Sequence, residues 1–163
     1  MPKIIIGVMG PGNGATPQDL ENAWELGKQI AQQGWVLLTG GRNVGVMDAA
    51  SRGAKSQQGL TIGILPSGDR ALVSEAVDIA IVTDLGNARN NINILSCDGI
   101  VACGMGAGTA SEVALAIKSQ KRVILLGCDR ETQVFFSKLA PTGIQAVETV
   151  ESAIALLQQW VSV

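Results

Sequence analysis

The sequence of 163 residues predicts an α/β fold, a single Rossmann-like domain in which helices cover both faces of a mostly parallel sheet. Short apolar runs alternate along the whole chain with longer segments of helical periodicity. Three of these apolar runs lead directly into glycine-rich loops. No linker, internal repeat or low-complexity segment divides the chain, so we expect one domain over residues 1–163.

Strands are expected where β-branched and aliphatic residues follow one another. Residues 3–9 read Lys-Ile-Ile-Ile-Gly-Val-Met, which is typical of a strand buried on both faces of a parallel sheet. Further strands are expected at 35–38, 60–65, 76–82, 99–103 and 122–126, with a short one at 145–147.

Helices are expected between these runs. Thr16 and Pro17 provide an N-cap and an N1 proline for a helix that ends near Gly34. Its sheet-facing side should consist of Leu20, Ala23, Trp24, Gly27, Ile30 and Ala31. Other helices are expected at 46–56, at 88–96, in the alanine-rich segment that runs to about 119, and at 148–160, while the stretch around Phe135 and Phe136 receives no assignment.

The composition excludes several classes of function. With 47% hydrophobic and 16% charged residues the chain is neither a disordered tail nor a coiled coil, and a net charge of −2 without a basic run argues against nucleic-acid binding. The absence of histidine excludes histidine metal sites and Ser–His or Cys–His pairs. The three cysteines lack zinc spacing, so we expect no metal site, and Cys103 is interpreted as a small buried residue.

The N-terminal residues enter the first strand without a signal-peptide pattern, and no apolar run approaches membrane-spanning length. We therefore expect a cytoplasmic protein that does not contact a membrane. The apolar composition of so short a chain also favours self-association.

The three glycine loops should meet at one edge, because every strand of a parallel sheet ends there before its helix begins. Such loops leave backbone N–H groups free to bind an anion, most directly at the start of a helix. We expect a phosphate- or carboxylate-bearing ligand at this edge. The candidate binding residues of the loops are Gly10, Gly12, Asn13, Gly40, Gly41, Gly45, Gly104, Met105, Gly106, Ala107, Gly108 and Thr109.

Three charged residues accompany these loops. Arg42 lies inside the second loop and Arg89 at the start of the helix after the fourth strand, where a guanidinium suits an oxyanion; each is also open to the reading of a surface arginine paired with an acid. Thr109 and Glu112 have the spacing of a capping box, which would make Glu112 a helix cap. Glu112 is equally suited to bind hydroxyl or N–H groups of a ligand, or to act as an acid or base.

Two common nucleotide sites fit poorly. The first loop reads G-x-G-x-G, and the second strand ends in Thr39-Gly40-Gly41, without the acidic residue that would bind a ribose. No glycine loop ends in Lys-Ser or Lys-Thr, as an ATP-binding loop of the Walker type requires.

Three segments taken in order resemble the LOG (lonely guy) superfamily, often labelled lysine-decarboxylase-like. They are Gly40-Gly41-Arg42-Asn43-Val44-Gly45-Val46-Met47, Arg89-Asn90, and Gly106-Ala107-Gly108-Thr109-Ala110-Ser111-Glu112. The resemblance extends from the first strand to the last helix. Within the superfamily the sequence looks most similar to the branch that contains molybdenum-cofactor carrier proteins.

LOG enzymes cleave the base from nucleoside 5′-monophosphates. By position, the resemblance implies that Arg89 anchors the substrate, that Gly106, Gly108 and Thr109 cradle the phosphate, and that Glu112 is the catalytic acid. Two departures concern catalysis. Gly104-Met105 replaces the Pro-Gly of the motif, which puts a bulky side chain beside the phosphate, and Asn90 replaces a lysine.

The carrier branch implies a different use of the same edge. Molybdenum cofactor is a pterin with a terminal phosphate and an oxyanionic metal centre held by its own dithiolene, so a protein can bind it without histidine or cysteine ligands. The first hypothesis is therefore a non-catalytic carrier in which residues 104–109 cradle an anionic group, Arg42 and Arg89 add charge, and Glu112 and the loop 10–13 contact polar parts of the ligand.

Two other hypotheses remain open: a nucleoside-monophosphate glycosidase with Glu112 and Arg89 as its catalytic residues, and a regulatory sensor of another phosphate-bearing, nucleotide-like ligand. The superfamily resemblance also implies a homo-oligomer, either a dimer or a tetramer. For a carrier, the expected protein partners are molybdoenzymes or proteins of cofactor synthesis.

Overall fold

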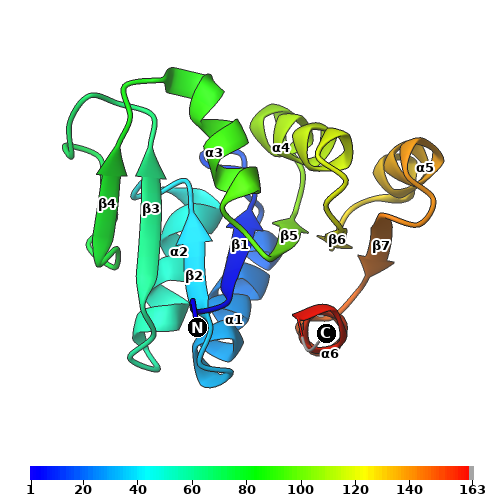
Figure 1. The fold of residues 1–163 in the computed structure, drawn as a ribbon, viewed down its shortest axis with the longest axis horizontal. Coiled ribbons are helices and arrows are strands. Elements are labelled where there is room, and N and C mark those ends of the chain that lie inside the picture. The colour runs from blue at the N-terminus through cyan, green and yellow to red at the C-terminus, as the bar shows by residue number, and fades with distance from the viewer. Residues whose placement is uncertain (162–163) are drawn as a thin grey trace.

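Seven parallel strands form one sheet in the order β4-β3-β2-β1-β5-β6-β7 (Figure 1). The computed structural model describes residues 1–161, and the parallel sheet within them confirms the predicted fold class. In the centre of the sheet Val8 of β1 pairs with Val101 of β5. The strands are β1 (Ile5–Met9), β2 (Val36–Thr39), β3 (Thr61–Leu65), β4 (Ile79–Val82), β5 (Gly99–Cys103), β6 (Val123–Leu126) and β7 (Ile144–Val147).

The strand order reverses between β1 and β5. From β1 the chain adds β2, β3 and β4 on one side, and then returns to place β5, β6 and β7 on the other. The loops after β1 and β5 therefore diverge from neighbouring strands, which leaves a crevice at their carboxyl ends. This crevice is where an open parallel sheet binds its ligands.

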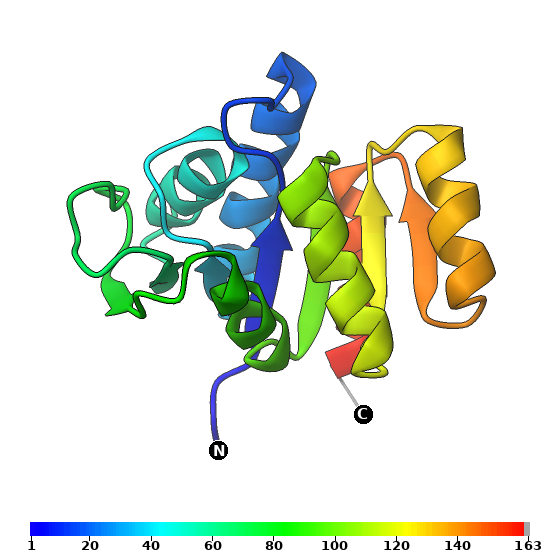
Figure 2. The same ribbon diagram turned by 90° about the horizontal axis from the view of Figure 1, so that it is seen from above.

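Helices cover both faces of the sheet (Figures 1 and 2). One apolar core joins the sheet to α1, α2 and α6, and a second joins it to α3, α4 and α5. The bounds are α1 (Pro17–Gln32), α2 (Gly45–Lys55), α3 (Arg89–Leu95), α4 (Ala107–Lys118), α5 (Arg130–Leu139) and α6 (Val150–Val161), and a 3-10 turn, Gly86–Ala88, precedes α3.

The start of α1 agrees with its prediction. Thr16 Oγ1 accepts a hydrogen bond from the backbone N of Asp19 at 3.1 Å, and the Asp19 carboxylate accepts one from the backbone N of Thr16 at 2.9 Å. Pro17 occupies the first turn, where its missing N–H costs nothing. This reciprocal cap fixes the point at which the chain leaves the first glycine loop.

The buried face of α1 differs from the predicted one. α1 packs against α2 as well as against the sheet, and a Cβ on Gly27 would lie 1.9 Å from the carbonyl oxygen of Ala50. This close approach turns Leu20 and Trp24 outward, where they are 38% and 40% exposed. Both were wrongly expected to pack on the sheet. The Lys28 ammonium lies 5.5 Å from the centre of the Trp24 ring.

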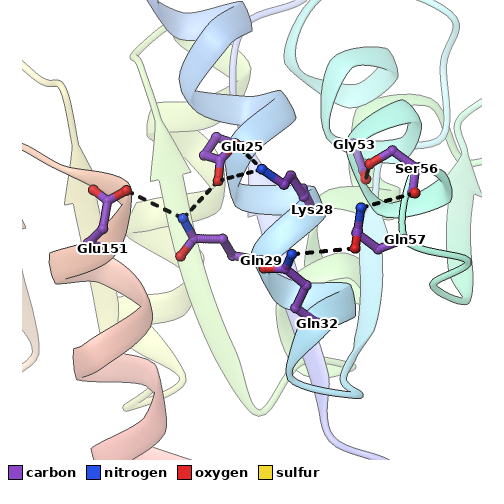
Figure 3. A network of polar contacts seen from close by, with 8 residues as sticks. All are labelled: Glu25, Lys28, Gln29, Gln32, Gly53, Ser56, Gln57 and Glu151. Carbon is purple, nitrogen blue, oxygen red and sulfur yellow. Dashed lines mark hydrogen bonds and ion pairs between the residues drawn. The ribbon is translucent and has the colours of Figure 1, made fainter.

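The outer surface of α1 carries polar contacts to its neighbours (Figure 3). Gln29 Nε2 donates to Glu25 Oε1 at 2.9 Å and to Glu151 Oε1 of α6 at 3.4 Å. Gln32 Nε2 donates to Gln57 Oε1, just beyond the end of α2, at 3.4 Å. These contacts link α1 to α6 and to the segment just after α2, on the side of the helices that faces away from the sheet.

One helix was missed, and the start of one predicted strand is wrong. α5 received no assignment from the sequence; it exposes Val134, Phe135 and Leu139 and buries only Phe136. The strand expected over 76–82 begins only at Ile79, because Asp78 instead accepts a hydrogen bond from the backbone N of Thr61 at 3.0 Å. Within the described part of the chain, the helices are too short or too polar to cross a membrane.

Candidate anion-binding site

A cavity of about 380 Å³ lies at the carboxyl ends of β1, β2 and β5. The three glycine loops meet there, as predicted from a parallel sheet. The lining comprises Val8, Met9, Gly10, Pro11, Gly12 and Gly14 from the first strand and loop, Gly40, Arg42 and Met47 from the second loop and α2, Asn87, Arg89 and Asn90 around α3, and Gly106, Ala107, Gly108, Thr109 and Glu112 of α4. The volume is typical of a site for a small organic ligand.

The first turn of α4 forms one wall of this cavity. Gly106 is the N-cap, in extended conformation, and no side chain caps the helix. The capping box predicted for Thr109 and Glu112 is therefore wrong, because the helix begins earlier and places Thr109 inside its first turn. A Cβ on Gly108 would meet nothing within 4 Å, so the backbone there is open to a ligand.

Thr109 contributes a hydroxyl without a partner. Its side chain is 2% exposed and its Oγ1 makes no hydrogen bond within residues 1–161. A buried hydroxyl left in this state costs free energy, which an anion in the cavity would recover. The orphaned hydroxyl and the uncapped helix start both lie on the wall of the same cavity.

Arg89 extends from the first residue of α3 into the cavity. It is 9% exposed; Nη1 donates to Asn90 Oδ1, whereas the buried Nε has no partner in the described part of the chain. Gly40 makes room for it, since a Cβ there would lie 2.8 Å from Nη2. Burial lowers the pKa of Arg89, and the charge of Arg42 lowers it further while that of Glu112 opposes both.

Arg42 lies half-buried on the opposite loop and its charge reaches Arg89. Its backbone pairs with Val73 in an isolated bridge, which ties the second glycine loop to the long β3–β4 connection. The side-chain ion pairs found among residues 1–161 join Lys28 to Glu25, Arg52 to Asp48 and Lys55 to Asp78. Neither site arginine belongs to one of these pairs, so both charges are available to an anion.

Glu112 lies one turn further along α4. It is 7% exposed, and Asn93 Nδ2 donates to its Oε1 at 2.9 Å. Burial raises the pKa of Glu112 to about 7, against the opposing effects of the Asn93 hydrogen bond and the Arg89 charge. Near neutral pH the group is therefore divided between carboxylic acid and carboxylate, and it can donate or accept a hydrogen bond.

Five predicted binding residues lie outside the lining of the cavity: Asn13, Gly41, Gly45, Gly104 and Met105. Gly45 has a φ of +59°, and a Cβ there would lie 2.3 Å from two carbonyl oxygens of the first loop. Gly104 has a φ of +73°, and its Cβ would lie 2.6 Å from the Asp19 carboxylate. These two glycines have a structural reason to be glycine that needs no ligand.

Polar residues of α3 were the main omission from the predicted site. Asn90 is in the lining and Asn93 stands behind Glu112 with its Oδ1 buried and unpartnered in the described structure. Their spacing from Arg89, one and four residues, was visible in the sequence, although the helix is too short for its buried side to be predicted. Cys103 is fully buried, as expected, and burial raises the pKa of its thiol.

Comparisons with known proteins identify a family and several solved structures that are similar to this chain. The model of the SLOG cluster4 family matches residues 3–154. The structure of a molybdenum cofactor binding protein from the phototrophic bacterium Rippkaea orientalis is 61% identical, covers 98% of each chain and superimposes with a TM-score of 0.95. The molybdenum cofactor carrier protein of Chlamydomonas reinhardtii is 52% identical, over 99% of this chain and 100% of that one, also with a TM-score of 0.95.

An enzyme is also similar to this chain. A cytokinin riboside 5′-monophosphate phosphoribohydrolase of Mycobacterium marinum is 28% identical over 151 residues, which is 86% of this chain and 81% of the enzyme. The chain is thus similar both to proteins described as binding or carrying molybdenum cofactor and to an enzyme.

Proposed function

The chain belongs to the SLOG cluster4 family, and on this premise we propose that it is a carrier that binds molybdenum cofactor in the cavity between β1 and β5. The family match confirms the predicted LOG resemblance. Carriers and enzymes share this resemblance, so only the residues of the site can favour a carrier. The observation that carries it is the concentration of donors in one cavity: among the described residues Arg42 belongs to no ion pair, and Arg89 Nε and Thr109 Oγ1 have no hydrogen-bond partner.

These donors suit the anionic parts of the cargo. The cofactor presents a terminal phosphate and an oxyanionic metal centre, and two arginines beside a helix N-terminus match ligands of that kind. Glu112 is suited to the N–H groups of the pterin. Met9 and Met47 supply an apolar surface to the cavity, which fits the flat side of a heterocycle. Because the dithiolene of the cargo holds the metal, the protein needs no ligand of its own.

The likeness to a molybdenum cofactor binding protein and to a molybdenum cofactor carrier protein, over nearly the whole of each compared chain, supports this proposal over a catalytic role. We expect no catalytic residue, and we expect the cargo to be stored, protected from oxidation and passed to user enzymes. Molybdoenzymes and proteins of cofactor synthesis are the proposed partners. The mass of the protein in solution should be that of a dimer or a tetramer, since Ile79 and Ile81 on the edge strand β4 are 45% and 44% exposed.

The test is a protection assay. Molybdenum cofactor released from a donor enzyme is incubated with the protein and then used to reconstitute a cofactor-free molybdoenzyme. We expect longer survival of the cofactor with the wild type, loss of this protection with Arg89→Ala or Arg42→Ala, and full protection with Arg130→Ala, an exposed arginine of α5 that serves as the control. No protection by the wild type, or equal protection by all variants, would overturn the proposal.

A second candidate is a nucleoside 5′-monophosphate phosphoribohydrolase. It is favoured by Glu112, whose pKa of about 7 suits a general acid at neutral pH, and by the similarity to the mycobacterial enzyme. Incubation with a panel of nucleoside monophosphates separates the two proposals. Release of the free base that Glu112→Gln abolishes would establish the enzyme, whereas absence of turnover with retained cofactor protection would establish the carrier.

A further inference from the structure

A chain of hydrogen bonds connects α3 to the first turn of α4 across the wall of the cavity. Arg89 Nη1 donates to Asn90 Oδ1, and Asn90 Nδ2 donates to Ser111 Oγ at 2.9 Å. The Ser111 hydroxyl in turn donates to the carbonyl oxygen of Gly108 at 2.6 Å. The guanidinium of Arg89 is thereby linked through two side chains to the turn that forms the anion cradle.

The chemistry of each member fixes the direction of this chain. A guanidinium can only donate, so it meets the amide oxygen of Asn90 and turns the amide nitrogen toward Ser111. The Ser111 hydroxyl accepts a hydrogen bond from that nitrogen and donates its own proton to the carbonyl oxygen of Gly108. An aspartate, leucine or alanine at position 90 would break this sequence, because none of them both accepts and donates.

The link also decides which edge of Arg89 faces the ligand. Nη1 is occupied by Asn90, which leaves the opposite edge of the guanidinium, formed by Nε and Nη2, for another partner. Arg89 Nε is buried and has no hydrogen-bond partner within the described residues. Thr109 Oγ1 is also buried and without a partner there, and it lies in the first turn of α4, to which Ser111 is hydrogen-bonded. An Nε–Nη2 edge presents two parallel N–H groups, which is the geometry that binds two oxygens of a phosphate.

We propose that Asn90 and Ser111 are positioning residues which lock the Arg89 guanidinium onto the first turn of α4, so that Arg89 and Thr109 bind one phosphate monoester together. The inference rests on the proposed function only in assigning an anionic ligand to this cavity. Ser111 lies outside the lining of the cavity, and Asn90, which belongs to the lining, acts through its hydrogen bonds to Arg89 and Ser111. They act by removing rotational freedom from the arginine before the ligand arrives, which lowers the entropic cost of binding.

Ser111 offers a clean test, because it is exposed and its replacement removes no buried group. Binding of methyl phosphate at pH 8 is followed by the NMR shift of the Gly108 amide. We expect Ser111→Ala to weaken binding about fivefold, or ~1 kcal/mol, and Ser111→Thr, which keeps the hydroxyl, to restore it to within twofold. Ser96→Ala is the matched control, since Ser96 makes the same kind of bond to Ile92 on α3, away from the relay.

Two further variants separate a relay from independent effects. We expect Asn90→Ala to weaken binding about tenfold, and the double variant Asn90→Ala/Ser111→Ala to bind no more weakly than Asn90→Ala alone, because both act on the same guanidinium. Unchanged binding in Ser111→Ala, no rescue by Ser111→Thr, or effects that simply multiply would overturn the inference. Circular dichroism of every variant shows that the fold is retained.

Arg89→Ala distinguishes this failure from failure of the proposed function. If Arg89→Ala abolishes methyl phosphate binding and Ser111→Ala does not affect it, the anion site stands and only the relay is refuted. If Arg89→Ala binds as well as the wild type, the cavity is not the anion site, and both the relay and the carrier proposal fall.

Discussion

Replacing Glu112 by glutamine should remove part of the pH dependence of the free energy of unfolding. Glu112 is 7% exposed, and burial raises its pKa to about 7 from an ordinary value of 4.5. Glutamine has nearly the same shape, cannot ionise, and keeps an oxygen that accepts the hydrogen bond from Asn93 Nδ2. The substitution therefore removes the titration while preserving the packing.

The magnitude follows from the two pKa values. Because the folded state holds the Glu112 proton more tightly than the unfolded state, this group stabilises the protein fully below pH 4.5 and loses that contribution as the pH rises through 7. A difference between 4.5 and about 7, at about 1.4 kcal/mol per pH unit, gives roughly 3 kcal/mol in total. About 2.5 kcal/mol of it is lost between pH 5 and pH 8.

Urea unfolding of the wild type and Glu112→Gln at pH 5, 6, 7 and 8 measures this difference. We expect the free energy of unfolding of the wild type to fall by about 2.5 kcal/mol more than that of the variant over this range. Glu21→Gln is the control, because Glu21 is exposed on α1 and its replacement should give a curve parallel to the wild type. Parallel curves for Glu112→Gln as well would refute the burial of an ionisable carboxyl at this position.

Four further outcomes are expected. Sulfate is a dianion over the whole pH range used, and its affinity can be measured by calorimetry. It should bind the wild type up to about tenfold more weakly at pH 8 than at pH 6, because Glu112 ionises over this range. The Glu112→Gln variant should bind sulfate equally well at both pH values. Thr109→Val should raise the free energy of unfolding by about 1 kcal/mol, because it removes a buried hydroxyl that has no partner among the described residues. The same variant should bind sulfate more weakly. A lower free energy of unfolding than that of the wild type would contradict this prediction. Gly108→Ala should leave the melting temperature unchanged or higher, because its Cβ meets open space, while a loss of sulfate affinity shows that the space belongs to the ligand. Gly45→Ala should cost more than about 3 kcal/mol in urea unfolding, given its φ of +59° and the carbonyls 2.3 Å away, and a near-neutral effect would refute that strain.

The convergence of the glycine loops could be predicted because it depends on topology alone. Parallel strands all end at one edge, so loops that follow β1, β2 and β5 must meet, whatever their side chains. Gly106, Gly108 and Thr109 line the cavity at that edge for the same reason, and their role in binding stays a prediction. The family resemblance was equally accessible, since short motifs in fixed order carry it and a family model matches residues 3–154.

Local capping was harder to predict, and the two cases differ instructively. At α1, Thr16 is the N-cap and Pro17 follows in the first turn, so the predicted cap is present. At α4, Thr109 and Glu112 have capping-box spacing, but Gly106 starts the helix three residues earlier. Gly106 has the extended backbone of an N-cap, which any residue can adopt, so the spacing of Thr109 and Glu112 does not reveal where the helix begins.

The sequence by itself determined the parallel sheet and the edge at which the glycine loops meet, because these depend on the order of apolar runs and glycines. Only the tertiary structure decided what each polar group does. Asn90, Asn93 and Ser111 are ordinary polar residues in the sequence, and they gain their roles from α3 lying against α4. The pKa of Glu112 likewise comes from burial between these helices, since desolvation depends on neighbours that are distant along the chain.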